Sequence, residues 1–415
     1  MNILLINHYA GSPRHGMEYR PFYLAREWVR AGHRVQIVAS SVSHVRSREP
    51  QFEGPHHDEV IEGVAYHWYR TPAYPGNGVK RVFNILSFLW QVRRDARRWA
   101  KGFRPDVVIA SSTYPMDIWV ARRIARLSGA KLVHEVHDLW PLSPIELGGM
   151  SPRHPFIRWC QAAEHTACRE ADLVVSMLPK VQAHMGERGL PLDRLAIVPN
   201  GITLDEWVAD PQPLEGEVQV AIQSARARGE KIVGYAGSHG LPNALDTLLD
   251  AAALMKGEPV RFLLVGGGLE KQRLQERAAR EGLDNVTLLP PIPKVQIPSL
   301  LAAFDVAYIG WQRTPIYRFG IAPNKLMDYM MAGCTVLHSV EAGNDPVAES
   351  GCGLSVPPED PAAVVAGLRQ LLAWTPQERL QRGEQGRQFV LAQHTYPVLA
   401  QRFTDAVLQV PPRST

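Results

Sequence analysis

Short apolar runs recur along the chain, each bounded by turn-forming residues. Six fall in the first half, at residues 3–6, 35–39, 107–110, 131–136, 173–176 and 195–198. Between them lie segments with the apolar period of a helix, such as 19–31, 117–128 and 155–169. Strands that alternate with helices predict a parallel, doubly wound sheet.

The same pattern begins again after residue 200. Further apolar runs occupy residues 232–235, 261–265, 286–289, 306–308 and 335–338, and long helical patterns follow from Pro361 onward. A chain of 415 residues is long enough for two such domains. We therefore predict two Rossmann-like domains joined between Asn200 and Pro213, with ligands beyond the carboxyl ends of the strands.

Composition narrows the class of protein. Hydrophobic residues make up 45% and charged residues 21%, as in a soluble globular protein. The chain opens directly on a strand without a secretory signal, and its four cysteines lack metal-ligand spacing. We expect a cytosolic protein with reduced thiols and no metal.

The positive charge is concentrated in the first half. Residues 1–200 contain 26 Lys and Arg against 18 Asp and Glu, whereas residues 201–415 contain 19 against 23. No zinc-finger or RNA-binding motif accompanies this charge, so nucleic acid is not the expected partner. An anionic membrane surface or a phosphate-bearing acceptor fits better.

One segment of the basic half combines apolar and basic residues. An apolar stretch at 82–90 is followed by Arg93, Arg94, Arg97, Arg98 and Lys101 at helical spacing. Nine such residues are too few to span a bilayer, but they can lie in its interface. The alternative is a packing helix with a solvated basic end, and the two interpretations can coexist.

The most informative segment is 320–333, which reads Gly-Ile-Ala-Pro-Asn-Lys-Leu-Met-Asp-Tyr-Met-Met-Ala-Gly. Pro323 disfavours helix before it, and Asn324 is predicted as the N-cap. The free N–H groups of Lys325, Leu326 and Met327, with the Lys325 ammonium, would attract phosphate. Asp328 could then accept hydrogen bonds from ribose hydroxyls. The alternative is an ordinary capped helix.

This segment resembles the donor-site signature of the family 4 retaining glycosyltransferases, in the variant Pro-Asn-Lys-Leu, any residue, Asp or Glu, Tyr-Met. His137-Asp138 and the run Val198-Pro199-Asn200-Gly201-Ile202 also match family motifs. The resemblance implies the GT-B fold, in which two Rossmann-like domains face each other across a cleft. It implies an acceptor-binding domain at 1–205, a nucleotide-sugar domain at 206–394 and a final helix at 395–415 that crosses back.

The resemblance also implies the activity. A hexosyl unit would pass from a nucleotide-diphosphate sugar, by family habit a UDP-sugar, to an acceptor hydroxyl with retention of configuration and without a metal. The motif variant is similar to that of bacterial enzymes of O-antigen, capsule or exopolysaccharide biosynthesis. This implies a lipid-linked saccharide acceptor and a peripheral place at the cytoplasmic face of the inner membrane.

Site residues follow from the same resemblance. His137 and Glu135 would contact the donor sugar, with Lys325 and Arg318 stabilising the departing diphosphate. Arg14, Glu18 and Arg20 would face the acceptor. The donor nucleotide would be held by Gly16, whose N–H would meet the diphosphate, and by Ser238, His239, Gly240, Gly267, Pro290, Ile292, Asn324, Lys325, Leu326 and Asp328.

The chain departs from the common family pattern at charged positions. The first of two family Glu residues is replaced by Gly320, and Ser238 and Asn243 stand in the loop where most members have Arg and Lys. This motivates a rival interpretation, a catalytically silent membrane-associated partner in a polysaccharide assembly complex. A GT-B sugar-nucleotide epimerase is a second rival. A nicotinamide dehydrogenase is disfavoured because Gly266-Gly267-Gly268 does not continue as a GxGxxG fingerprint.

Overall fold

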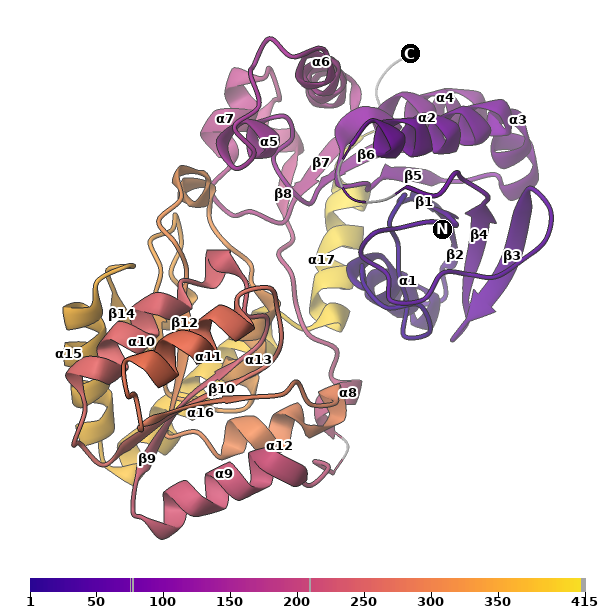
Figure 1. The fold of residues 1–415 in the computed structure, drawn as a ribbon. Coiled ribbons are helices and arrows are strands. Elements are labelled where there is room, and N and C mark those ends of the chain that lie inside the picture. The colour runs from indigo at the N-terminus through magenta and orange to yellow at the C-terminus, as the bar shows by residue number, and fades with distance from the viewer. Residues whose placement is uncertain (75, 77, 209, 412–415) are drawn as a thin grey trace. The chain divides into compact units, whose positions relative to one another are not determined.

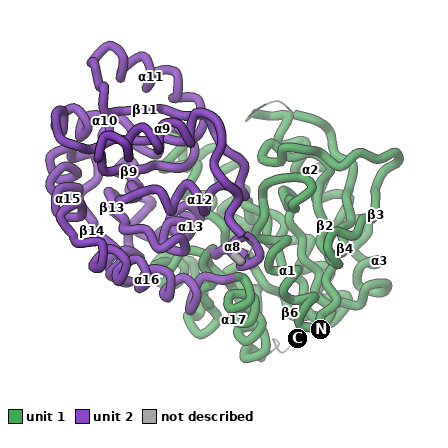
Figure 2. The backbone as a smooth tube through the Cα atoms, turned by 90° about the horizontal axis from the view of Figure 1, so that it is seen from below, with its two compact units in different colours: residues 1–200, 396–415 green, residues 201–395 purple. Residues whose placement is uncertain are grey.

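The computed structural model describes residues 1–74, 76, 78–208 and 210–411. The chain divides into two compact units, Met1–Asn200 with Tyr396–Thr415, and Gly201–Thr395 (Figure 1, Figure 2). The division falls after Asn200, at the start of the join expected between Asn200 and Pro213, whereas the resemblance placed the domain boundary at residue 205. The last helix, α17 (Tyr396–Gln409), belongs to unit 1, as the expected return of the chain requires.

Unit 1 contains an eight-stranded sheet in the order β3-β4-β2-β1-β5-β6-β7-β8. All neighbouring strands are parallel except β3 and β4, which form an antiparallel hairpin at one edge. The strands are β1 (Asn2–Ile6), β2 (Arg34–Ser40), β3 (His56–Ile61), β4 (Val64–Tyr69), β5 (Val107–Ala110), β6 (Lys131–Val136), β7 (Leu173–Ser176) and β8 (Leu195–Ile197). The sequence pattern did not predict β3 and β4.

Helices flank this sheet. They are α1 (Arg20–Arg30), α2 (Val79–Arg94), α3 (Ala96–Arg98), α4 (Ile118–Ser128), α5 (Leu142–Glu146), α6 (Pro155–Glu170) and α7 (Gln182–Glu187), with α17 from the end of the chain. The expected apolar and basic helix is interrupted at Asp95, after which α3 and a π-helical turn, Trp99–Phe103, continue it. The Asp95 carboxylate accepts a hydrogen bond from Tyr69 Oη at 2.9 Å, which fixes the interruption against β4.

Unit 2 contains a six-stranded, all-parallel sheet in the order β11-β10-β9-β12-β13-β14. The strands are β9 (Lys231–Ala236), β10 (Val260–Val265), β11 (Val286–Leu289), β12 (Val306–Gly310), β13 (Val336–Ser339) and β14 (Gly353–Val356). The helices are α8 (Asp205–Val208), α9 (Gly216–Ala227), α10 (Leu245–Leu254), α11 (Lys271–Arg280), α12 (Ile297–Ala302), α13 (Asn324–Met331), α14 (Pro346–Ser350), α15 (Pro361–Ala373) and α16 (Pro376–Gln393).

Strand order reverses beside the first strand of each unit. In unit 1 the chain moves outward on one side of β1 and returns on the other at β5, and in unit 2 the same reversal lies between β9 and β12. Such switch points leave room beyond the carboxyl ends of the strands, where ligands bind in doubly wound sheets. The candidate residues of both units follow strands at these edges.

Helix α17 packs on α1 inside the core of unit 1. The Trp28 indole stacks edge-on against Phe403, with ring centroids 5.2 Å apart, and its Nε1 donates to the Ala400 carbonyl at 3.1 Å. Tyr396 packs on Tyr23 with the two rings tilted by 37° and their centroids 4.9 Å apart. The end of the chain is therefore a structural part of the first unit.

Truncating this contact should destabilise unit 1. Phe403 is buried, so Phe403→Ala should lower the free energy of unfolding by about 3–5 kcal/mol through lost contacts and a residual cavity. Leu408, exposed on the same helix, provides the control, because Leu408→Ala should change stability by no more than about 0.5 kcal/mol. Denaturant unfolding followed by tryptophan fluorescence measures both; equal effects would contradict the assigned role of α17.

Candidate active site

Two glycine-containing loops meet at the carboxyl edge of the unit 2 sheet. Gly237 follows β9 and Gly266 follows β10. A Cβ atom on Gly266 would lie 1.9 Å from the Gly237 carbonyl oxygen, and the Gly266 φ of +154° is one that other residues rarely adopt. Only glycine permits this contact, so the two loops pack directly on each other. The N–H groups of Gly237 and Gly266 donate to the carbonyls of Val265 and Leu289 at 3.0 and 3.2 Å.

Buried side chains support the loops from below. Lys271 Nζ donates to the carbonyls of Gly266 and Leu289 at 2.9 and 2.7 Å. His239 is fully buried beside them, and neither of its ring nitrogens has a hydrogen-bond partner among the described residues. Burial, with Lys271 and Lys325 nearby, lowers the pKa of His239 to about 4. His239 is thus a neutral supporting residue beneath the loop, and its carbonyl accepts from Glu270 N–H at 3.0 Å.

Helix α13 begins one residue earlier than predicted. Pro323 is the N-cap, Asn324 is the first helical residue, and no side chain caps the helix. The N–H of Met327 donates to the Pro323 carbonyl at 3.4 Å, so it is not free as predicted. The remaining first-turn N–H groups belong to Asn324, Lys325 and Leu326, and the helix dipole still favours an anion in front of them.

Gly320, at the start of the loop before this helix, accounts for one departure from the family. Its φ is +94°, a region that residues with side chains rarely adopt. The Glu that most family members carry here would be strained on this backbone. Asn344 holds the next residue, accepting from Ile321 N–H at 2.7 Å and donating to its carbonyl at 3.1 Å.

The Lys325 ammonium is oriented by neutral oxygen atoms. Nζ donates to Tyr235 Oη at 2.6 Å and to Asn243 Oδ1 at 2.9 Å, and it lies 4.2 Å from the centroid of the Tyr235 ring. Among the residues that the structure describes, no carboxylate pairs with it. Burial lowers the pKa of Lys325 to about 7. The site therefore holds a partly buried ammonium group that has no carboxylate counter-charge among the described residues.

Asp328 lies one turn further along α13. Burial raises its pKa to about 7, with Lys294 opposing and Glu206 reinforcing the shift. Lys294 and Glu206 form an ion pair at 2.6 Å, and the Asp328 carboxyl has no hydrogen-bond partner within the described part of the chain. It is free to accept hydrogen bonds from hydroxyl groups.

The sequence did not lead us to name three residues of this site as candidates. Tyr235 and Asn243 hold Lys325, while Tyr329 joins α13 to the end of β9. The Tyr329 hydroxyl accepts from Ala236 N–H at 2.8 Å and donates to the Ala236 carbonyl at 3.1 Å. Tyr329 belongs to the Tyr-Met pair of the motif, which was the available signal.

The other predicted donor-site residues occupy varied positions. Ser238 is exposed, and its carbonyl accepts from Tyr235 Oη at 2.6 Å and Asn243 Nδ2 at 3.0 Å. The Gly267 carbonyl accepts from His239 N–H at 2.8 Å, and Gly240 adjoins Ser238. Pro290 is exposed after β11, whereas Ile292 packs against the core. Arg318 is exposed, stacks on Phe319 at 4.3 Å and donates to the Pro315 carbonyl at 2.6 Å.

In unit 1, His137 belongs to a buried hydrogen-bonded group at the carboxyl edge. Ser111 Oγ donates to Glu135 Oε2 at 2.6 Å and lies 2.9 Å from His137 Nε2, which is 3.2 Å from Glu135 Oε2. Two oxygen acceptors therefore face Nε2, which places a proton on that nitrogen. Nδ1 is the ring nitrogen left to meet a ligand.

Glu135 and Arg20 are not the surface residues that were expected. Arg20 is 1% exposed; it pairs with Glu135 at 2.9 Å and donates to the carbonyls of Val198 and Pro199. Glu135 is wholly buried. Burial alone would raise the pKa of Glu135, but Arg20, His137 and Ser111 hold it below its ordinary value. Arg20 therefore does not face an acceptor, and Glu135 positions His137 without reaching a substrate.

The predicted phosphate loop of unit 1 also differs from expectation. The N–H of Gly16 already donates to the Ser12 carbonyl at 2.8 Å, and a Cβ there would lie 2.5 Å from Ser47 Oγ. Gly16 is thus needed for packing, and its N–H is not offered to a diphosphate. Arg14 is exposed and pairs with Glu59 at 3.2 Å, and Glu18 is partly exposed.

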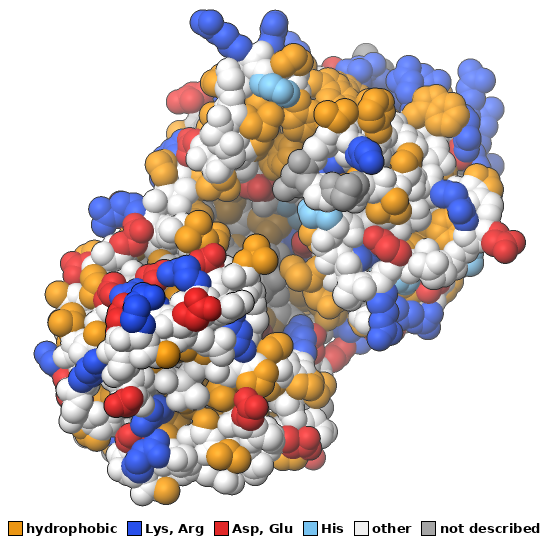
Figure 3. Space-filling model, viewed as in Figure 1, with side chains coloured by type: hydrophobic (Ala, Val, Ile, Leu, Met, Phe, Trp, Pro, Cys, Tyr) orange, Lys and Arg blue, Asp and Glu red, His pale blue; other side chains and the backbone are white. Residues whose placement is uncertain are grey.

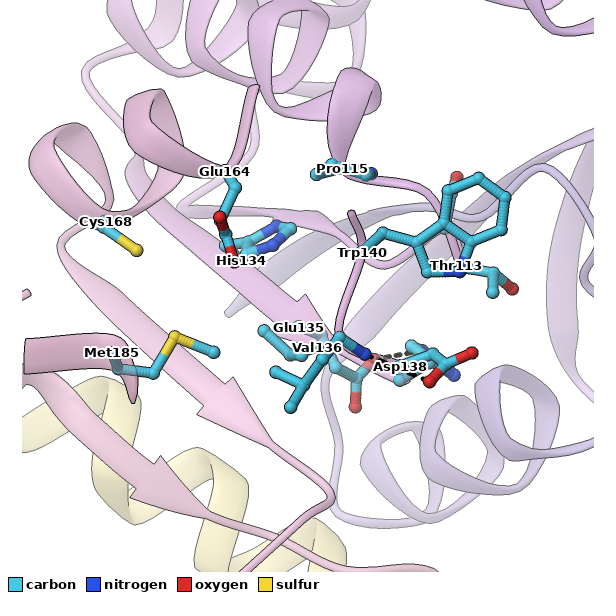
Figure 4. Close-up of a pocket in the computed structure, with 13 residues that line it drawn as sticks. Thr113, Pro115, His134, Glu135, Val136, Asp138, Trp140, Glu164, Cys168 and Met185 are labelled. Carbon is cyan, nitrogen blue, oxygen red and sulfur yellow. Dashed lines mark hydrogen bonds and ion pairs between the residues drawn. The ribbon is translucent and has the colours of Figure 1, made fainter. Parts of the chain in front are cut away.

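His137 is one of the residues that line a small cavity. Figure 4 shows this cavity with its lining side chains. Glu164, Cys168 and Met185 line one side, and Thr113 and Trp140 line the other. Its volume of about 20 Å³ is enough for one water molecule and far too small for a sugar. A sugar that meets His137 must therefore approach from the open edge of the sheet.

Lys325 predicts how nucleotide affinity depends on pH. Above pH 7 the ammonium loses its proton, so affinity for UDP should fall as pH rises from 7 to 9, by up to about tenfold per unit. Binding should be accompanied by proton uptake, measurable by calorimetry in buffers of different ionisation enthalpy. The free energy of unfolding should depend on pH in the opposite direction to UDP affinity. Between pH 7 and 9 Lys325 holds more protons in the unfolded chain than in the folded one, so its contribution to stability rises with pH.

The matched variant is Lys325→Met, which should bind UDP weakly and without this pH dependence. A wild-type affinity that stays level from pH 7 to 9, or a Lys325→Met protein that retains the slope, would contradict this assignment.

Comparison with known proteins agrees with this architecture. Residues 15–201 match the model of the glycosyl transferase 4-like domain, and residues 230–373 match that of glycosyl transferases group 1. WcaI of Escherichia coli K12, named as a colanic acid biosynthesis glycosyl transferase, is 25% identical over 363 residues, covering 83% of this chain and 86% of WcaI.

Solved structures share the fold over nearly the whole chain. Sucrose-phosphate synthase from Thermosynechococcus elongatus superposes with a TM-score of 0.70 at 19% identity, covering 98% of both chains. Anabaena HepE, solved in complex with UDP and glucose, superposes with a TM-score of 0.65 at 16% identity, covering 99% of this chain and all of HepE. With a glycosyltransferase domain model matching each unit, the chain belongs to the GT-B glycosyltransferases.

Proposed function

We propose that this enzyme transfers a hexosyl unit from a UDP-sugar to a hydroxyl of a lipid-linked saccharide, with retention of anomeric configuration. The observation that carries the proposal is the Lys325 ammonium, held by Tyr235 and Asn243 at the start of α13 without a carboxylate partner among the described residues. A diphosphate supplies the missing counter-charge. HepE, whose fold this chain shares, was solved with UDP and glucose.

The reaction needs charge stabilisation more than proton transfer. The glycosyl C–O bond breaks with its electron pair going to the diphosphate, while the acceptor oxygen bonds to the anomeric carbon and its proton leaves with the diphosphate. Lys325 and the first-turn N–H groups of α13 would stabilise the charge that builds on the leaving group. Asp328 would bind the ribose hydroxyls, and His137 Nδ1 would bind a hydroxyl of the sugar. Arg318 stays a candidate for a second cation.

The biological setting is inferred from a relative. WcaI is named for colanic acid biosynthesis, which supports a role in making a surface polysaccharide. Growing saccharides of this kind are built on lipid carriers, so we place the enzyme at the cytoplasmic face of the inner membrane. No metal or other cofactor enters this proposal, because protein groups would meet the diphosphate charge.

Ligand binding and turnover test the proposal together. UDP should raise the melting temperature of the purified protein more than GDP, ADP or NAD do, because it binds the native state. Sugar from a labelled UDP-sugar should appear in a lipid-extractable product. An altered UDP-sugar without any acceptor product would indicate an epimerase, and no stabilisation by any nucleotide would indicate a silent partner.

Removing the Lys325 charge should reduce turnover strongly. We expect Lys325→Met to lower kcat by about 100-fold or more, as the loss of a leaving-group cation does. Lys256, exposed at the opposite, amino edge of the same sheet, provides the control, and Lys256→Met should retain native turnover. Near-native turnover of Lys325→Met would refute the assigned role.

His137 can be tested by side chains that mimic one ring nitrogen at a time. The side-chain amide of Asn lies about as far from the backbone as Nδ1 of His does, whereas the amide of Gln lies about as far as Nε2 does. Because Nε2 faces Ser111 and Glu135, His137→Asn should retain about tenfold more kcat/KM than His137→Gln, the value of one hydrogen bond. The reverse order, in variants with equal melting temperatures, would show that Nε2 and not Nδ1 meets the substrate.

A further inference from the structure

Helix α2 presents a stripe of large apolar side chains to solvent. Phe83 and Trp90 are each 61% exposed, and Val79 and Leu86 are exposed beside them. Their spacing of four, three and four residues places all four on one face of the helix. The opposite face, with Ile85, Phe88, Leu89 and Val92, is buried in unit 1. We call the four exposed residues the α2 ridge.

The segment that continues α2 is strongly basic. Arg93, Arg94, Arg97, Arg98 and Lys101 are all exposed, and Lys80 adds a cation at the start of the helix. Asp95 is the one acidic residue between 79 and 101, and it is already paired with Arg94 at 2.9 Å. In Figure 3, apolar and basic side chains lie side by side where Figure 1 shows α2 and α3.

The basic side chains make few contacts within unit 1, so they can meet a second surface. The Arg94 guanidinium lies 5.2 Å from the Trp90 ring centroid, so the basic group adjoins the end of the ridge. Arg98 Nη1 lies 3.3 Å from His56 Nε2, and the Arg98 guanidinium lies 5.9 Å from the Trp99 ring centroid. A surface that joins exposed aromatic rings to uncompensated cations matches the interface of an anionic bilayer, where rings enter the acyl boundary and cations meet phosphates.

We propose that the α2 ridge and the basic segment 93–101 form a docking surface for an anionic lipid bilayer. No helix in the described ranges is long and apolar enough to cross a membrane. The contact is therefore peripheral, with the ridge inserted at headgroup depth and the arginines over the lipid phosphates. This surface shares no residues with the proposed nucleotide site, and the proposal does not depend on the transfer reaction.

Vesicle sedimentation tests the charge component. The full chain should sediment with vesicles of phosphatidylcholine mixed with phosphatidylglycerol, less so at high salt, and weakly with phosphatidylcholine alone. Replacing Arg93, Arg94, Arg97 and Arg98 by Gln should weaken binding at least about tenfold. The control replaces Arg153, Arg158, Arg169 and Lys180, exposed elsewhere in unit 1, and should bind almost as the native chain does.

A second pair of variants tests the ridge itself. Phe83→Ser with Trp90→Ser should weaken vesicle binding severalfold, whereas Leu147→Ser with Leu192→Ser, at 58% and 54% exposure, should not. UDP-induced stabilisation should be unchanged in all variants, which separates this result from a failure of the nucleotide site. Equal binding by ridge and control variants would overturn the proposal. So would a ridge variant that binds vesicles normally but loses a concentration-dependent dimer, which would assign the ridge to a second copy of the chain.

Discussion

The candidate site of unit 2 is organised around the Lys325 ammonium, which no carboxylate among the described residues neutralises. A partly buried ammonium loses hydration, and in most proteins a carboxylate compensates for that loss. Here the compensation among the described residues comes from the neutral oxygens of Tyr235 and Asn243 and from the face of the Tyr235 ring. Tyr329 ties α13 to the end of β9, the strand that carries Tyr235, so the ammonium is held near the start of the helix. An anion bound beside Lys325 would offset the lost hydration, so the empty site would exchange stability for affinity.

Unit 1 solves the opposite problem. One of its buried charges is the Glu135 carboxylate, which Arg20, Ser111 and His137 satisfy from within the chain. A buried ion pair with complete hydrogen bonding adds little net stability, but it fixes geometry, because breaking it leaves an unpaired charge. Arg20 also binds the carbonyls of Val198 and Pro199, so the same guanidinium that restrains Glu135 anchors the end of the unit before the join. Among the described residues, unit 2 leaves a lysine without a carboxylate partner, whereas unit 1 fixes the orientation of the His137 ring.

The two Rossmann-like units could be predicted because buried parallel strands are continuous apolar runs, which the sequence shows directly. The hairpin β3–β4 was missed because its outer strand, with His56, Asp58 and Glu59, is a polar edge. Arg20 was misplaced because its partner Glu135 lies 115 residues away, a pairing that local pattern does not reveal. The hydrogen bond between Tyr329 and Ala236 was missed for the same reason, because these residues are 93 positions apart. Local chemistry singled out Lys325 and Asp328 as candidates, whereas the residues that orient Lys325 required the fold.

Helix α2 is apolar on both faces along much of its length. Its inner face accounts for the packing of unit 1, so the ridge is not needed for the fold, and exposed aromatic rings carry a cost in solubility. A packing helix with a solvated basic end, the simpler interpretation, explains the arginines but not Phe83 and Trp90. Charged residues on the outer face would have served such a helix better. The ridge and the basic segment make sense together only if a surface that is both apolar and anionic covers them.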